Sequence, residues 1–401
     1  MSKPLLSEHQ PRFTASPPLS LYIHIPWCIR KCPYCDFNSH ETDDNLPPES
    51  AYVEALIADL ENDLPLIWGR TVTTLFIGGG TPSLFSAQSI ENLLSQLRAR
   101  LRFGSDTEIT LEANPGAIDA ERFKEYHAAG INRLSIGIQS FDDGLLRKLG
   151  RIHTGQQALL AVELARTAGF ENINLDLMFA LPEQTAGMAE HDLRTAIELQ
   201  PEHISYYQLT IEPNTPFYHH PPTPCDDELI WKMQEEAKQL LAGHGYAQYE
   251  VSAYARQQRR CRHNLNYWQY GDYLGIGAGA HSKLINPHTR SITRLTKVRH
   301  PRQYLASAGS PRCIQTRNPL QTEEIALEFM MNALRLTEGF ESRLFTTHTG
   351  LPLAFLQTAL ETAVGKGLIN RDALHIRPTD LGKRYLNNLL ELFLPTQKKP
   401  L

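Results

Sequence analysis

Three of the six cysteines lie close together, and their spacing predicts a site for an inorganic cluster. Cys28, Cys32 and Cys35 fall in the run WCIRKCPYCDF, with three and then two residues between them. A structural zinc ion takes four protein ligands, and a four-iron cluster usually takes four cysteines, one per iron. Three cysteines on such a cluster would leave one iron open to a substrate. A zinc site completed by His24 or His40, or a redox cysteine pair with a spare thiol, fits the same pattern.

Polar or glycine-rich segments follow several apolar runs at the point where each run ends. Gly78, Gly79, Gly80 and Thr81 follow the run TLFI, and glycines let a ligand approach the backbone closely. Polar side chains at the ends of three later runs are Glu112, Gln139 and Asp176. A turn or a helix cap would explain any one of them alone. In β/α barrels the chemistry takes place at the carboxyl ends of the strands, so we expect these groups to meet in one site.

Short apolar, β-branched runs alternate with longer amphipathic stretches over the first two thirds of the chain. This alternation is typical of β–α units in series and predicts a parallel sheet. The predicted strands are residues 19–26, 73–77, 108–113, 133–138, 172–179 and 203–209. The predicted helices are residues 49–64, 87–101, 119–129, 156–168, 190–199 and 226–242. A doubly wound sheet also fits, but the polar strand ends favour an α/β fold with a partial parallel (β/α)6-type barrel.

Four segments are expected along the chain. Residues 1–18 are predicted to be a loose tail, and residues 19–285 the barrel domain. Residues 286–318 are basic and irregular and are expected to be a linker or surface excursion. Residues 319–401 read as helices around a short hairpin, an order that resembles a winged-helix module. Its acidic and basic residues are interleaved without a basic face, which favours a cap or docking domain over nucleic-acid binding.

The composition is that of an ordinary globular protein. The chain has 401 residues, of which 41% are hydrophobic and 21% charged, so wholesale disorder is excluded. The formal net charge of −5 disfavours nucleic acid as the main partner. No apolar run approaches the roughly 20 residues of a membrane helix. The clustered cysteines favour reduced thiols and a cytoplasmic location, with any membrane contact made through a partner.

The cysteine spacing resembles the signature of the radical S-adenosylmethionine (SAM) superfamily. In that superfamily three cysteines hold a [4Fe–4S] cluster, and SAM binds the open iron and is cleaved by reduction. The runs LYIHIPWC, GGGTPS, LEANPG, SIGIQSF and LDLMFALPEQT further resemble the HemN-like group, which includes the oxygen-independent coproporphyrinogen dehydrogenases. The match covers residues 21–209 and continues more weakly beyond. By position in these motifs, the resemblance implies SAM contacts for Tyr22, Tyr34, Gly79, Gly80, Thr81, Glu112, Gln139, Arg151 and Asp176.

The chain differs from the coproporphyrinogen dehydrogenases of this group in two features. The coproporphyrinogen dehydrogenases carry a further cysteine two residues after the third, where this chain has Phe37. The run HNLNYW is an H-N-x-x-Y-W motif of the kind found in HemW-type heme chaperones. That resemblance implies heme binding by His263, Asn264, Tyr267 and Trp268, and delivery of heme to apo-hemoproteins such as respiratory-chain enzymes. Independently of the family, an imidazole can ligate heme iron and aromatic rings can cover a porphyrin.

Several alternatives stay open at this point. Tyr270, Tyr273 and His281 lie close in sequence to the motif and could take the same role. The main alternative function is a coproporphyrinogen III dehydrogenase, and a third is a non-catalytic zinc or interaction protein. No catalytic residue is assigned, and both SAM cleavage and homodimer formation are left undecided.

Overall fold

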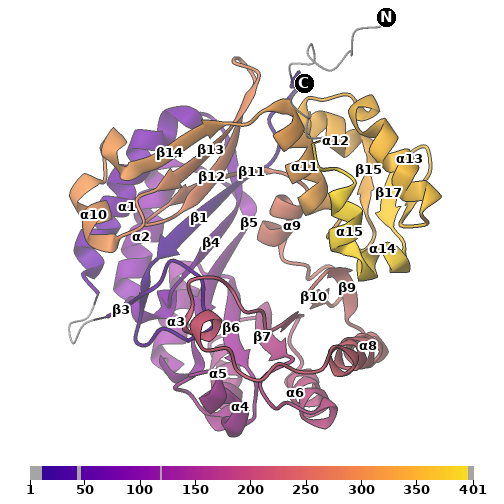
Figure 1. Cartoon of the computed structure of the whole chain (residues 1–401). Coiled ribbons are helices and arrows are strands. Elements are labelled where there is room, and N and C mark those ends of the chain that lie inside the picture. Colours follow the sequence, from indigo (N-terminus) through magenta and orange to yellow (C-terminus); the bar gives the residue numbers. More distant parts are fainter. Residues whose placement is uncertain (1–10, 43–46, 118–119, 396–401) are drawn as a thin grey trace, which may run out of the picture.

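One large sheet dominates the structure, a computed structural model that describes residues 11–42, 47–117 and 120–395 (Figure 1). Six of its strands run parallel, and each pairs with the next one along the chain. They are β1 (Leu19–Ile25), β4 (Thr71–Gly79), β5 (Arg102–Ala113), β6 (Arg133–Gln139), β7 (Ile173–Phe179) and β8 (His203–Gln208). The strand order follows the chain without reversal, as in a β/α barrel, whereas a doubly wound sheet reverses its order. The predicted parallel α/β fold is confirmed.

Helices cover the sheet between successive strands, as the amphipathic stretches predict. They are α1 (Glu49–Asp63), α2 (Ala87–Arg100), α3 (Ala120–Ala129), α5 (Gly155–Thr167) and α6 (Ala186–Glu198), with α8 (Asp227–Gly243) packed on α6. Helix α2 illustrates why these segments are helical. Ser86 caps its first turn by accepting a hydrogen bond from the Ser89 N–H, and Ile90, Leu94 and Leu97 lie on its buried face. These helices hold the parallel strands, and therefore their carboxyl ends, in place.

Further strands extend the sheet on both sides. Next to β1 lie β11 (Asp272–Ile276), which is parallel to it, and then the antiparallel strands β12 (His281–Asn286), β13 (Ser291–Lys297) and β14 (Ile314–Pro319). Next to β8 lie β10 (Ala253–Ala255) and β9 (Ala247–Glu250).

The prediction of a linker over residues 286–318 is wrong, because this segment forms β13, α10 (Pro301–Ser307) and β14. The run SITRLTK buries Ile292 and Leu295 and keeps polar residues between them. These two residues are an odd number of positions apart, so they lie on opposite faces of the strand and pack into different cores, and no alternating pattern marks the strand in the sequence.

The C-terminal part has a core of its own. It contains α11 (Thr322–Ala333), β15 (Phe340–Glu341), α12 (Ser342–Thr349), α13 (Gln357–Gly365), β16 (Ile369–Arg371) and β17 (His375–Pro378). The three strands form a small antiparallel sheet, and Phe329, Phe345 and Leu360 are buried among the helices. The helices and hairpin follow in the predicted order. The exact domain bounds stay a prediction.

The start of the described chain lies against this C-terminal part. The Arg12 N–H donates to the Gly350 carbonyl at 2.8 Å, and Pro11 is buried. The first ten residues of the predicted tail lie outside the described residues. Within residues 11–42, 47–117 and 120–395, no helix is both long and apolar enough to span a bilayer.

Candidate functional site

The three clustered cysteines line one cavity of about 430 Å³, here called the cluster cavity. Cys28 ends the short strand β2 (Trp27–Cys28), which pairs with β3 (His40–Glu41) and turns the loop back on itself. The Cys35 N–H donates to the Cys32 carbonyl at 3.1 Å, and the Lys31 ammonium donates to the carbonyl of Phe37 at 3.0 Å. Within the described part of the chain, no three His, Cys, Asp or Glu side chains converge to hold a single metal ion.

The carboxyl ends of the parallel strands form the opposite wall of the cluster cavity. Eight of the nine residues implied as SAM contacts line it: Tyr34, Gly79, Gly80, Thr81, Glu112, Gln139, Arg151 and Asp176. The ninth, Tyr22, lines a neighbouring cavity together with Gly79 and Glu112. The structure therefore brings these strand ends together as expected, while their contacts with SAM stay a prediction.

Glycine is required at residues 79 and 80, at the end of β4, because neighbouring protein groups leave no room for a side chain there. Gly79 has φ +120°, and a Cβ on it would lie 2.7 Å from the His24 ring. A Cβ on Gly80 would lie 2.4 Å from the Trp27 carbonyl oxygen. The Gly80 N–H donates to the Ile25 carbonyl at 2.7 Å. The glycine segment therefore passes directly against the end of β1, and this close approach positions it beside the cysteines.

Two half-buried carboxyl groups face the cluster cavity. The Glu112 side chain accepts a hydrogen bond from the Gly79 N–H at 3.0 Å and makes no ion pair with a described residue. Burial raises the pKa of Glu112 to about 8, and repulsion by Asp176 contributes. Burial also raises the pKa of Asp176, although Ser135 and Asn174 donate hydrogen bonds to it. Such a carboxyl would recover its charge beside a cationic ligand, so the wall fits the ammonium and sulfonium groups of SAM.

A cation lies beside the cysteine loop. Arg151 extends one guanidinium nitrogen to 3.7 Å from the Cys32 sulfur, and another donates to the Gly137 carbonyl at 2.6 Å. The Cys32 sulfur therefore faces a guanidinium group at the edge of the cavity. Gln139 ends β6 in a left-handed conformation with φ 68°, and its side-chain oxygen accepts a hydrogen bond from the Tyr207 hydroxyl at 2.7 Å.

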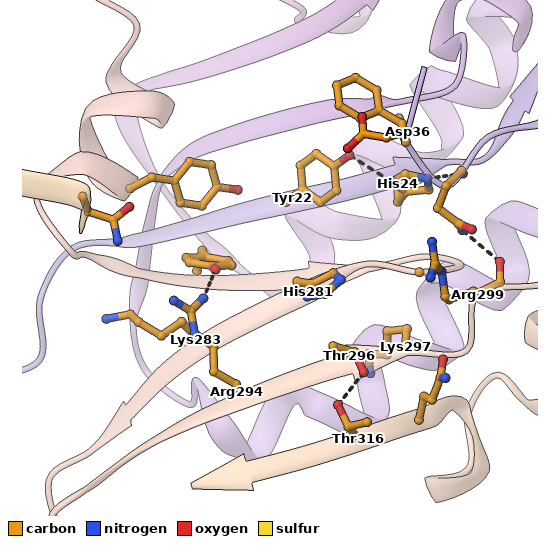
Figure 2. A pocket seen from close by; sticks show the side chains of 18 of the residues that line it. Tyr22, His24, Asp36, His281, Lys283, Arg294, Thr296, Lys297, Arg299 and Thr316 are labelled. Atoms are coloured by element: carbon orange, nitrogen blue, oxygen red, sulfur yellow. Dashed lines mark hydrogen bonds between the residues drawn. The ribbon is translucent and has the colours of Figure 1, made fainter. Parts of the chain in front are cut away.

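A second cavity of about 690 Å³ adjoins the first and is here called the side cavity (Figure 2). Strands β1, β11, β12 and β13 contribute to its walls, together with helix α9 (Arg262–Trp268) and Asn332 of α11. Helix α9 lies between the sheet and the C-terminal helices (Figure 1). The residues that line both cavities are Asp36, Phe37, Gly79 and Glu112. Phe37, which stands where the dehydrogenases carry their further cysteine, is 59% exposed at this border.

The four residues of the HNLNYW motif are placed differently. Tyr267 and Trp268 line the side cavity, whereas His263 and Asn264 do not. His263 is 1% exposed, with Nδ1 2.9 Å from the Thr74 hydroxyl and Nε2 3.0 Å from the Tyr267 hydroxyl. Burial lowers the pKa of His263 to about 3. Because both ring nitrogens are engaged, this structure does not offer His263 to an iron; it positions the Tyr267 ring instead.

Sequence reasoning missed the charged groups of the side cavity. Lys283, Arg294 and Arg299 line it beside the alternatives Tyr270, Tyr273 and His281. Arg294 and Arg299 lie in the basic stretch that was expected to be a linker. No alternation of apolar and polar residues was available as a signal for this strand, because its apolar residues Ile292 and Leu295 lie on opposite faces.

Two family models match the chain. The model of the radical SAM superfamily matches residues 22–196, and the model of the HemN C-terminal domain matches residues 320–385. The chain is 49% identical over 378 residues to the heme chaperone HemW of Escherichia coli, covering 94% of this chain and 98% of that protein. It is 37% identical over 385 residues to the heme chaperone HemW of Bacillus subtilis, covering 94% and 99%.

A solved structure shares the whole architecture. The coproporphyrinogen III oxidase HemN of Escherichia coli, described as a radical SAM enzyme, superposes with a TM-score of 0.79 at 23% sequence identity. The match covers 94% of this chain and 90% of that protein. At this level of identity the likeness establishes the fold alone.

Proposed function

The chain belongs to the HemW family of heme chaperones within the radical SAM superfamily, and from this membership we propose that it binds heme and transfers it to apo-hemoproteins. The observation that supports the proposal most directly is the position of Tyr267 and Trp268. Both motif residues line a cavity of about 690 Å³ that shares a wall with the cysteine site. A pocket of a few hundred Å³ with aromatic walls is of the kind that binds a planar cofactor.

We further propose that Cys28, Cys32 and Cys35 hold a [4Fe–4S] cluster and that the strand ends hold SAM beside it. The cluster with SAM supplies one-electron chemistry when bound. The chain's own residues would bind and orient SAM and the cluster. Glu112 and Asp176 present carboxyl groups to the cavity, and the Arg151 guanidinium lies beside the Cys32 sulfur. The residues proposed to contact SAM are Tyr22, Tyr34, Gly79, Gly80, Thr81, Glu112, Gln139, Arg151 and Asp176.

For heme, the proposal assigns the motif two kinds of role. Tyr267 and Trp268 would lie against the porphyrin, since both reach the cavity. His263 would act through its hydrogen bond to Tyr267, and Asn264 lies on the same helix. The recipients proposed are respiratory-chain or other membrane hemoproteins, met by a cytoplasmic chaperone at the membrane surface through a partner.

A hemin titration under anaerobic conditions tests the heme proposal. We expect the full-length protein to bind hemin saturably with a developed Soret band, and Trp268→Ala to weaken binding several-fold through loss of ring contact. Trp231→Ala is the matched control, because Trp231 lies on α8 and lines neither of the two cavities. Absence of saturable binding by the wild type would overturn the proposal.

An anaerobic assay with coproporphyrinogen III separates the chaperone from the dehydrogenase. We expect no protoporphyrinogen to form, in line with Phe37 in place of the further cysteine. Product formation that depends on SAM would establish the dehydrogenase instead. SAM cleavage alone does not distinguish the two functions.

A further inference from the structure

Heme presents two features that a protein site can recognise besides its flat face. Its iron takes an axial ligand, commonly an imidazole nitrogen, and its propionates are carboxylates that pair with guanidinium groups. A heme site in the side cavity therefore needs a nitrogen base and a cation that are not already engaged. The side chains of the cavity can be sorted by this criterion.

Two of the three histidines in or behind the side cavity are already engaged through both ring nitrogens. His24 is 5% exposed, with Nδ1 2.9 Å from the Tyr22 hydroxyl and Nε2 2.8 Å from the Asn38 carbonyl. His263 is held by Thr74 and Tyr267 and does not line the cavity. Either ring would have to break buried hydrogen bonds to reach an iron, and this would leave buried polar groups unpaired.

His281 is the third histidine, and it is free. It begins strand β12 and is exposed, and although its backbone pairs with Thr296 of β13, its imidazole makes no hydrogen bond with any residue of the described chain. Figure 2 shows its ring between Tyr22 on one wall and Arg294 and Thr296 on the other. Partial burial lowers the pKa of His281, and Arg294 and Arg299 add to this effect. A lowered pKa favours the neutral ring, which is the form that ligates a metal.

The cations of the cavity divide in the same way. Lys283 is fully buried and paired with Asp272 at 3.1 Å. Arg294 is paired with Glu328 at 2.7 Å. Arg299 follows β13, is exposed, and forms no ion pair within the described ranges. One imidazole and one guanidinium are thus uncommitted on the same cavity.

We propose that His281 supplies the axial imidazole to heme iron in the side cavity and that Arg299 pairs with a heme propionate. This inference rests on the heme-binding function proposed above and deepens it. It places the iron ligand on β12, outside the HNLNYW motif, while Tyr267 and Trp268 of the motif form the cavity wall.

Hemin titrations of His281→Ala and its control test the ligand. We expect His281→Ala to weaken hemin binding roughly tenfold or more and to change the Soret position and the heme spin state. His288→Ala on the turn after β12 should match the wild type, because His288 is exposed and lines neither cavity. Added imidazole should restore the wild-type spectrum in His281→Gly. Because His281 is exposed, its variants should keep the wild-type unfolding temperature.

Comparison of hemin with hemin dimethyl ester tests the proposed contact between Arg299 and a propionate. We expect Arg299→Ala to weaken hemin binding several-fold and to leave the binding of hemin dimethyl ester unchanged, since the ester has no free carboxylates. Arg290→Ala is the matched control, because Arg290 is an exposed arginine on the turn before β13 that lines neither cavity.

The outcomes separate this inference from the function on which it rests. If the wild type fails to bind hemin, both are overturned. If the wild type binds hemin and His281→Ala keeps its affinity and spectrum, the ligand assignment is wrong and the chaperone function stands. The assignment is equally overturned if His263→Gln abolishes the ligand signature at unchanged unfolding temperature while His281→Ala does not. Equal effects of Arg299→Ala on hemin and on the ester would overturn the propionate contact.

Discussion

The two adjoining cavities are built in different ways. The cluster cavity is lined by a loop of consecutive residues and by the ends of neighbouring parallel strands, which follow one another in sequence. The side cavity is lined by segments that are far apart, from Tyr22 of β1 to Asn332 of α11. The first arises from a repeated local unit, and the second depends on how antiparallel strands and a separate helix pack against that unit.

The difference also appears in how each cavity is supported. In the cluster cavity, Asp176 and Gln139 accept hydrogen bonds from side chains of the parallel strands β6, β7 and β8. The outer strands of the side cavity are tied to the barrel by buried charge. Lys297 of β13 lies 2.6 Å from both Asp59 and Asp63 of α1, and all three are buried. The repeated β–α units thus position the residues of the cluster cavity, whereas individual buried ion pairs hold the strands of the side cavity in place.

The largest expected effect distinguishes the occupants of the two cavities. Alanine at Cys28, Cys32 and Cys35 together should reduce bound iron from about four per chain to none, since no thiolate is left to hold the cluster. Hemin affinity should stay within a few-fold, because the cysteines do not line the side cavity. Iron analysis, with and without hemin, measures both.

The control for the cysteine variant is Cys225→Ala, because Cys225 does not line the cluster cavity and donates to the Leu181 carbonyl. It should keep its iron. A triple variant that loses hemin binding along with its iron would show that the two cavities act as one site.

The next effect concerns the support of the side cavity. Lys297→Met should lower the free energy of unfolding by about 3–5 kcal/mol, because it leaves two buried carboxylates without their cation. Urea unfolding measures the change. Lys232→Met is the matched control: its pair with Glu236 is exposed, and its loss should cost at most about 0.5 kcal/mol. Equal stability of the two variants would contradict the supporting role of the buried ion pair.

The smallest effect concerns a group that both cavities share. Glu112 has a pKa of about 8 when folded, against an ordinary value of 4.5, because it is buried. The folded state therefore keeps its proton while the unfolded state loses it, and stability falls as pH rises from about 4.5 to 8. Glu112→Gln should match the wild type at the low end of this range. At the high end it should be more stable by about 1–3 kcal/mol.

Thermal unfolding of the ligand-free proteins across this pH range checks the Glu112 prediction. SAM should reduce the difference between them, if the carboxylate pairs with a cationic group of the ligand. Parallel pH profiles for the two proteins would show that Glu112 is already ionised in the folded state.

The strands that form the cluster cavity were predicted from the sequence, whereas an outer strand of the side cavity was not. The six parallel strands were predicted to within a few residues at most boundaries, because strands buried on both faces are continuous apolar runs. The first boundary of β5 was placed six residues late, at Glu108 instead of Arg102, since the exposed start of that strand is polar. Strand β13 was missed because its two apolar residues, Ile292 and Leu295, lie on opposite faces and give no alternating pattern.

By itself, the sequence determined the alternation of strands and helices and the cysteine spacing, because both are written in the order of neighbouring residues. The tertiary structure decided which side chains are free to act. His263 looks like a ligand in its motif, yet a hydrogen bond to Thr74, 189 residues away in the chain, engages it. His281 belongs to no motif, and its imidazole has no hydrogen-bond partner among the residues that the structure describes. Burial and hydrogen bonding depend on which distant segments pack together, and local residue order does not encode them.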